Sequence, residues 1–133
     1  PTPEDILLTD NLTLRNLGLS NSKVKYVKDL SQKTVDRELV LNGINNKSDE
    51  EIILELTKVK GIGTWTAHMF LIFTLCRLNV LPTGDLGIKK GVMNLYRLKE
   101  IPDEETIFRI SKKYKWSPYN SIASWYLWRS LEL

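Results

Sequence analysis

The feature that most constrains the fold is a Gly-Ile-Gly element at residues 61–63, set between two helical patterns. Residues 56–67 read as a helix that stops at the glycines and a second helix that starts at about Thr64. We expect both glycines to allow a positive φ and a close approach of the backbone to another surface. The first amides of the second helix, at its positive dipole end, form an anion site, and a DNA phosphate is its natural occupant.

A carboxylate follows this element. An apolar helix is expected over residues 67–78, and a Pro-Thr-Gly turn then leads to Asp85, just before a helix expected over residues 87–96. Aspartate is among the best residues for capping a helix N-terminus. A carboxylate held near a sugar can also stabilise an oxocarbenium-like transition state or act as a base. The two roles are compatible, and the residues alone leave both open.

Four segments follow one another along the chain: PTPED…LRNLGLSNSKVKYVKDL, VKGIGTWTA, LPTGDLGIKKGV and KWSPYNSIASWYLWRSL. Together they resemble the helix-hairpin-helix GPD superfamily of DNA glycosylases, and within it the 3-methyladenine DNA glycosylase II group. The resemblance covers nearly the whole chain. The commonest hairpin pattern of the family has proline before the first glycine, where this chain has Lys60. Proline there only stiffens the turn.

The apolar residues recur with the 3.6-residue period of helices, and the sequence has no strand signal of useful length, so it predicts an all-α fold. A chain of 133 residues, 42% of them hydrophobic, is long enough for one compact domain. The resemblance implies a single helix-hairpin-helix glycosylase domain over residues 1–133. It also implies further helices upstream, so we expect the C-terminal portion of a longer family enzyme, or a second polypeptide that supplies the rest.

Capping and turn residues locate further helices. The helix that starts at Ser20 or Asn21 carries an apolar set as far as Leu39, with one slip in its register. Ser48 and Glu51 form a capping box for the helix that leads into the glycines. Helices are also expected from Pro3, over residues 11–17, 103–114 and 117–131, with a turn at Gly43.

The resemblance implies roles for particular residues. Asp85 is the expected catalytic carboxylate, and Trp65 and Trp128 are expected to line the base pocket. The DNA backbone is expected to bind at Gly61, Ile62, Gly63, Thr64 and Thr66. No cofactor is expected to be required, but the resemblance implies a structural Na⁺ or K⁺ held by the backbone carbonyls of Thr57, Val59 and Ile62.

Trp65 bears on the type of reaction. Members of the family that also cut the DNA backbone have at this point a lysine that attacks the sugar, and Trp65 has no nucleophile. Lys60 precedes the glycines, on the side expected to face the DNA backbone, and is not expected to replace that lysine. The resemblance thus implies a monofunctional glycosylase that excises alkylated purines such as 3-methyladenine in base excision repair. Two alternatives remain: a non-catalytic DNA-binding module, and a glycosylase for oxidised or mismatched bases.

The remaining aromatic residues are concentrated near the C-terminus. Electron-rich rings attract cationic alkylated bases, but aromatic residues at helical spacing more often pack in a core or at a rim. Trp125 and Trp128, three residues apart, should share a helix face. The only histidine, His68, is expected to be a surface or phosphate-side residue. Core or rim positions are expected for Trp116, Tyr119, Trp125 and Tyr126.

Charge and composition restrict the partners. Residues 1–56 hold seven basic and ten acidic side chains, whereas residues 57–133 hold twelve and six, so the half with the hairpin could face phosphates of double-stranded DNA. Cys76, the only cysteine, lies in an apolar segment, which suits a reducing compartment and excludes a four-cysteine iron-sulfur cluster. No zinc-ligand spacing and no apolar run of roughly 18 residues is present, so neither zinc nor a membrane span is expected. We expect the cytoplasm or nucleoid, or the nucleus in a eukaryote, and self-association or a partner chain if upstream helices are absent.

Overall fold

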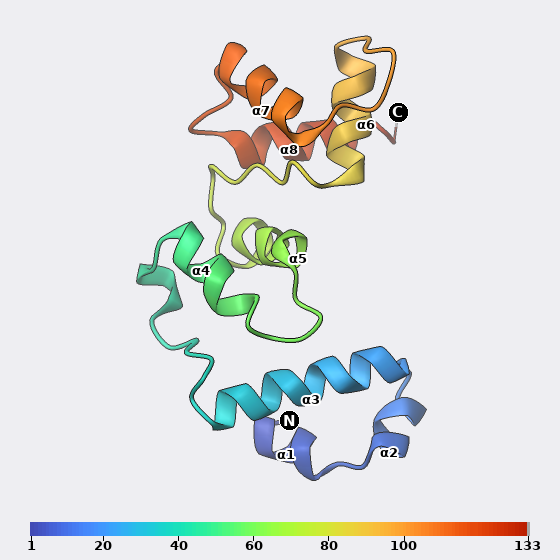
Figure 1. Cartoon of the computed structure of the whole chain (residues 1–133), viewed down its shortest axis with the longest axis vertical. Coiled ribbons are helices and arrows are strands. Elements are labelled where there is room, and N and C mark those ends of the chain that lie inside the picture. The colour runs from blue at the N-terminus through green and yellow to red at the C-terminus, as the bar shows by residue number, and fades with distance from the viewer. Residues whose placement is uncertain (133) are drawn as a thin grey trace. The chain divides into compact units, whose positions relative to one another are not determined.

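The computed structural model describes residues 1–132, and this range contains helices and no strand, as predicted. The chain divides into two compact units, Pro1–Ala67 and His68–Leu133 (Figure 1). Each unit is described by itself below. The assignment of residues 1–133 to one domain stays a prediction.

The first unit contains α1 (Pro3–Leu8), α2 (Asn11–Asn16), α3 (Asn21–Val35), the 3-10 turn η1 (Ile44–Asn46), α4 (Asp49–Leu56) and the start of α5 (Thr64–Met69). α1 and α2 pack against α3, the longest helix (Figure 1). Side-chain caps begin α1, α2, α3 and α4. The predicted capping box is present, because Ser48 Oγ accepts the Glu51 N–H and Glu51 accepts the Ser48 N–H.

α3 is shorter than its apolar pattern predicted. It ends at Val35, and Arg37 has a φ of 59°, so the slip expected near Ser31 falls within the helix and Leu39 lies beyond its end. Leu39 is nevertheless buried, from the loop that follows. The Val40 N–H donates to Glu55 of α4 at 2.6 Å, which fixes this loop on α4. The hydrogen bond from Lys58 and then that from Val40 hold the pKa of Glu55 below its ordinary value.

The second unit begins within α5. The apolar helix expected over residues 67–78 is in fact the end of α5 followed by one π-helical turn, η2 (Phe70–Thr74). Cys76 has a φ of 52°, which an α-helix does not allow, so the predicted helix extended too far along the chain. Cys76 was also expected in an apolar setting but is exposed, because the chain has left the helix at this point.

Three further helices enclose the core of the second unit: α6 (Leu86–Leu95), α7 (Glu104–Lys113) and α8 (Asn120–Arg129). α6 packs on α8. α8 begins three residues later than expected, since the first bond of the helix joins the Ala123 N–H to the Tyr119 carbonyl. Four buried apolar side chains meet between these helices: Ile88, Val92, Ile107 and Leu127.

Candidate active site

Asp85 is the N-cap residue of α6. Its Oδ1 accepts the N–H of Ile88 at 2.8 Å, which is the capping role that its position in the sequence predicted. Its own N–H donates to the Pro82 carbonyl at 2.9 Å, so the Pro-Thr-Gly turn brings the chain into the helix. The carboxylate therefore sits at the positive end of α6.

Trp128 of α8 contacts the same carboxylate. Its indole Nε1 donates to Asp85 Oδ1 at 2.8 Å, and the half-buried ring packs on the core of the second unit. Two N–H donors from two helices thus converge on one oxygen. This arrangement fixes the carboxylate in one orientation, and it brings together two of the predicted site residues.

Gly87 makes the approach of Trp128 possible. A Cβ atom at Gly87 would lie 2.8 Å from Trp128 Cδ1 and 3.0 Å from Asp85 Oδ1, both closer than ordinary contacts. Sequence reasoning used Gly87 only as the start of a helix and missed this role. The available signal was a glycine inside the first turn of a helix, where most other residues are better helix formers.

The segment before Asp85 is hydrogen-bonded to α8 and α7. Ser121, a buried residue of α8, accepts the Val80 N–H at 3.0 Å and donates to the Arg77 carbonyl at 2.6 Å, while its N–H donates to the Leu78 carbonyl. Thr83 Oγ1 donates to Glu104 at the start of α7, at 2.7 Å. These bonds set the position from which Asp85 enters α6.

An aromatic hollow adjoins Trp128. Phe73 stacks on Trp128 with ring centroids 5.9 Å apart and an interplanar angle of 28°. The hollow has a volume of about 300 Å³, and Trp125 and Trp128 share it, which confirms that they lie on one face. Phe73 was not among the predicted site residues, because a phenylalanine within an apolar run is expected to be buried in the core. The lining residues are Phe73, Trp125, Trp128, Arg129 and Glu132.

The two hairpin glycines differ. Gly61 has a φ of 88°, as predicted, but Gly63 does not adopt a positive φ, so that part of the prediction was wrong. Gly63 stands at the N-cap position of α5, where its carbonyl accepts the Ala67 N–H at 3.0 Å, and an N-cap residue has an extended backbone. No atom lies within 4 Å of where a Gly63 Cβ would stand. Gly63 therefore leaves open space for another molecule's backbone.

The other hairpin residues differ in their exposure and in the partners of their backbone groups. Thr64 and Thr66 are exposed, whereas Val59 is buried. The Ile62 N–H donates to the Val59 carbonyl at 3.1 Å, so this amide already has a partner within the hairpin. A carbonyl oxygen has two lone pairs, so the Val59 carbonyl is still compatible with a cation. The phosphate and cation roles stay predictions.

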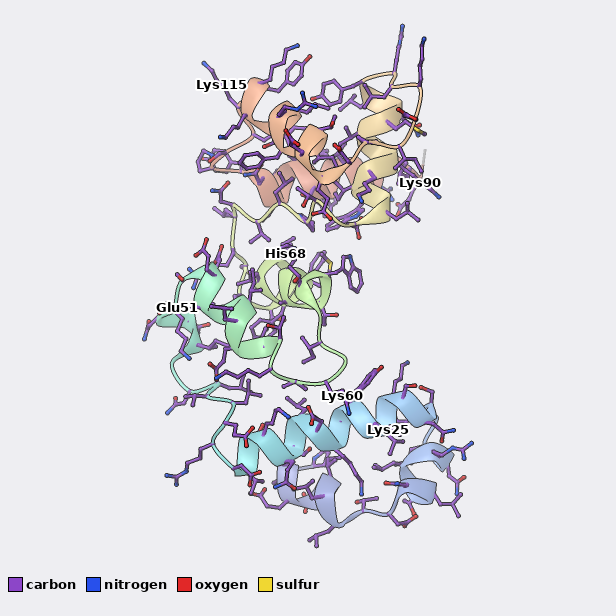
Figure 2. The ribbon with its side chains drawn as sticks, viewed as in Figure 1. Lys25, Glu51, Lys60, His68, Lys90 and Lys115 are labelled. Carbon is purple, nitrogen blue, oxygen red and sulfur yellow. The ribbon has the colours of Figure 1, made fainter. Side chains whose placement is uncertain are left out.

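The structure places three further residues that the sequence singled out. Trp65 is 53% exposed in the first unit, and its part in a base pocket stays a prediction, since Asp85 and Trp128 belong to the second unit. His68, expected to be a surface or phosphate-side residue, is half-buried, and its place beside a phosphate stays a prediction. Lys60 lies at the hairpin next to α3, where its N–H donates to Asp29 (Figure 2).

Residues 1–132 show neither a clustered metal site nor a membrane-spanning helix. These residues include no group of three or more His, Cys, Asp or Glu side chains that could hold a metal ion. Within the same residues, no helix has the length and apolar character needed to cross a membrane.

Comparison with known proteins decides the family. The model of the HhH-GPD superfamily of base excision DNA repair proteins matches residues 1–116. The chain belongs to this superfamily. It is 37% identical over 134 residues to DNA-3-methyladenine glycosylase 1 of Schizosaccharomyces pombe, an alignment that covers 100% of this chain and 58% of that protein.

Solved structures of the superfamily show the same fold. The 3-methyladenine DNA glycosylase of S. pombe in complex with abasic DNA matches with a TM-score of 0.88 and 36% identity, over 100% of this chain and 64% of that one. A DNA-3-methyladenine glycosidase of Bacillus halodurans matches with a TM-score of 0.82 and 33% identity, over 97% and 58%. The chain spans less than two thirds of the length of each relative.

Proposed function

We propose that this chain belongs to a monofunctional DNA glycosylase that excises alkylated purines, such as 3-methyladenine, by hydrolysis of the N-glycosidic bond. The observation that carries the proposal is the Asp85 carboxylate, presented at the start of α6 and bonded to Trp128 beside an aromatic hollow. A module that only binds DNA could use the carboxylate to cap α6, but it has no need of the aromatic hollow at Trp128.

The proposed chemistry needs a fixed negative charge. When the bond between the base and C1′ breaks, its electron pair leaves with the base and positive charge develops on the sugar. A carboxylate that is already oriented stabilises this charge without reorganising, and the two N–H donors on Asp85 Oδ1 supply the orientation. Water then adds to C1′ and gives up a proton, which Asp85 can accept, so that an abasic site remains.

The lack of an amine at Trp65 supports hydrolysis without strand cleavage. A bifunctional glycosylase forms a Schiff base through a lysine, and Trp65 offers none. Borohydride should therefore fail to trap the chain on abasic or alkylated DNA. A stable cross-link that maps to Lys60 would contradict a monofunctional mechanism.

The names of the relatives and the hollow support alkylated purines as substrates. The relatives compared above are named for 3-methyladenine, a base that carries positive charge, and indole rings such as that of Trp128 attract cations. A glycosylase for oxidised bases is the second candidate within the superfamily. Competition between 7-methylguanine and 8-oxoguanine duplexes distinguishes the two.

We propose that the DNA backbone binds at the hairpin, at Gly61, Gly63, Thr64 and Thr66. Gly63 leaves open space, and the relative from S. pombe was solved with abasic DNA. A Na⁺ or K⁺ at the carbonyls of Thr57, Val59 and Ile62 would join the hairpin to a phosphate. A plot of the logarithm of the association constant against the logarithm of the salt concentration should have a slope of about −0.9 for each phosphate that is neutralised. Because the hairpin would bind phosphate mainly through amides and few lysines, we expect this slope to be shallow.

Exposed leucines of α1, α2 and the turn after α2 motivate a proposal about assembly. Leu8, Leu12 and Leu17 are 86%, 65% and 77% exposed. Because large uncovered apolar patches rarely stay solvated, we propose that these side chains are covered by other protein, through self-association or a partner chain. Sedimentation of the chain at rising concentration tests this. A DNA substrate would place the protein in the nucleoid or nucleus.

The direct test of the proposed function is release of the base. Duplex DNA that carries 7-methylguanine or 3-methyladenine is incubated with an excess of the chain, and the released base is measured by chromatography. We expect slow release, because the cost of base flipping is a few kcal/mol. Release should be faster when the lesion is mispaired. No release from any of these substrates by a chain that binds them would contradict the proposal.

A further inference from the structure

Asp29 of α3 binds the backbone of the hairpin directly. Its Oδ2 accepts the N–H of Lys60 at 2.6 Å, and its Oδ1 accepts from Lys33 Nζ at 2.9 Å. The Asp29 side chain is 25% exposed. The bonds from Lys33 and then Lys60 hold the pKa of Asp29 below its ordinary value, so the acceptor stays charged near neutral pH.

Tyr26, one turn earlier on α3, holds the next hairpin residue. A Cβ atom at Gly61 would lie 2.3 to 2.5 Å from three atoms of the Tyr26 ring, so the ring rests directly on the glycine Cα. Residues three apart share a helix face. One face of α3 thus contacts two successive hairpin residues, Lys60 by a hydrogen bond and Gly61 by packing.

Lys60 stands where the hairpin pattern of the family more often has proline. A proline would fix φ through its ring, but it has no N–H to donate. In this chain the N–H is present, and Asp29 accepts it. The hydrogen bond can therefore restrain the loop in place of the proline ring.

We propose that Asp29 and Tyr26 are positioning residues, which hold the hairpin in the conformation that binds the DNA backbone. Neither residue is proposed to touch DNA. The inference rests on the proposed binding of DNA by the hairpin. It adds that this chain restrains its hairpin from α3, through a bond that proline at position 60 would make unnecessary.

The sign of the effect separates positioning from simple electrostatics. Removing a negative charge close to a phosphate-binding loop should strengthen DNA binding by Coulomb's law. If Asp29 instead positions the hairpin, its removal should weaken binding. Asp36 provides a matched control, because it follows the same helix and its carboxylate accepts from Gln32 rather than from the hairpin.

The experiment measures the affinity of the full chain for a duplex that contains a tetrahydrofuran abasic-site analogue. Asp29→Ala should weaken binding about five-fold or more, as expected for the loss of a hydrogen bond to a charged acceptor. Asp29→Asn keeps an oxygen acceptor for the Lys60 N–H and should bind within about two-fold of wild type. Asp36→Ala should bind as tightly as wild type or more tightly.

Rescue by proline is the decisive readout. Lys60→Pro should restore the affinity of the Asp29→Ala variant, because the ring replaces the lost restraint. A proline at a compatible position can also raise overall stability, so the affinities are compared under conditions in which urea unfolding shows every variant to be fully folded. If Asp29→Ala does not fold, hydrogen exchange of the Lys60 amide is measured in the wild-type chain instead. This amide should be protected from exchange, because Asp29 accepts its N–H.

Three results would overturn the inference: unchanged or tighter binding by folded Asp29→Ala, failure of Lys60→Pro to rescue it, or fast exchange of the wild-type Lys60 amide. Failure of the wild-type chain to bind any DNA would instead contradict the proposed function, and the two outcomes are therefore distinguishable.

Discussion

The indole Nε1 of Trp128 donates to Oδ1 of Asp85 at 2.8 Å, across 43 residues of sequence. The same ring stacks on Phe73 and lines the aromatic hollow. One side chain therefore joins the proposed catalytic carboxylate to the surface where we propose that the base is held.

Trp128→Phe should separate these two contributions. Phenylalanine keeps an aromatic surface for Phe73 but cannot donate to Asp85, so the rate of base release should fall about ten-fold, the size expected for a hydrogen bond to a charged group. DNA affinity should change little. Trp125→Phe is the control, because Trp125 lines the same hollow and is half exposed. Equal rates for the two variants would mean that the bond to Asp85 does not matter.

Gly87→Ala should displace Trp128 from Asp85. The added Cβ would lie 2.8 Å from the indole, and overpacking of this kind costs about 1–3 kcal/mol of stability. Gly84→Ala is the matched control, since a Cβ there would meet only Glu104 at an ordinary distance of 3.6 Å. The stability measured by urea unfolding and the rate of base release should both fall for Gly87→Ala and stay near wild type for Gly84→Ala. A fully active Gly87→Ala variant would show that the ring can move without loss.

Gly63→Val tests the hairpin surface. A Cβ at this position would meet nothing beyond its chain neighbours, so the variant should fold, with a loss of about 1 kcal/mol because valine is a poorer N-cap residue than glycine. Its side chain would fill the space that we assign to the DNA backbone, and DNA affinity should fall several-fold. An affinity equal to that of wild type would mean that the hairpin has only a structural role.

Glu55 should make stability depend on pH. Its pKa is lowered in the folded state, mainly by Lys58, so its contribution is fully present above the ordinary pKa of glutamate and is lost as pH falls through the lowered value. Glu55→Gln should therefore be less stable than wild type at pH 7, and the difference should shrink toward pH 3. Urea unfolding at several pH values measures it. A difference that is constant over this range would contradict the assignment.

The parts of the fold with local signals were predicted from the sequence. The capping box at Ser48 and the cap at Asp85 depend on side chains that bond to amides three residues later, and such bonds need no tertiary contact. The left-handed Gly61 is local in the same sense. The family resemblance added Trp128.

The contacts that the sequence did not predict are tertiary. The contact of Phe73 with Trp128 was not predicted, because Phe73 lies in a π-helical turn at the end of an apolar run, and no pattern in the sequence indicates this turn. Gly87 is needed only because Trp128, from α8, approaches it. The bond from Lys60 to Asp29 spans 31 residues and leaves no pattern in either segment. The helix over 67–78 was overextended because apolar periodicity continues past the residue where the backbone turns.

The central claim is that Asp85 carries the chemistry, and single-turnover base release by Asp85→Asn tests it most directly. Asparagine keeps an oxygen that can cap α6 and accept from Trp128, but it removes the charge. With enzyme in excess over a 7-methylguanine duplex, the rate should fall by about 10² to 10³ relative to wild type, while DNA affinity stays within a few-fold. Release at more than about a tenth of the wild-type rate would contradict the account.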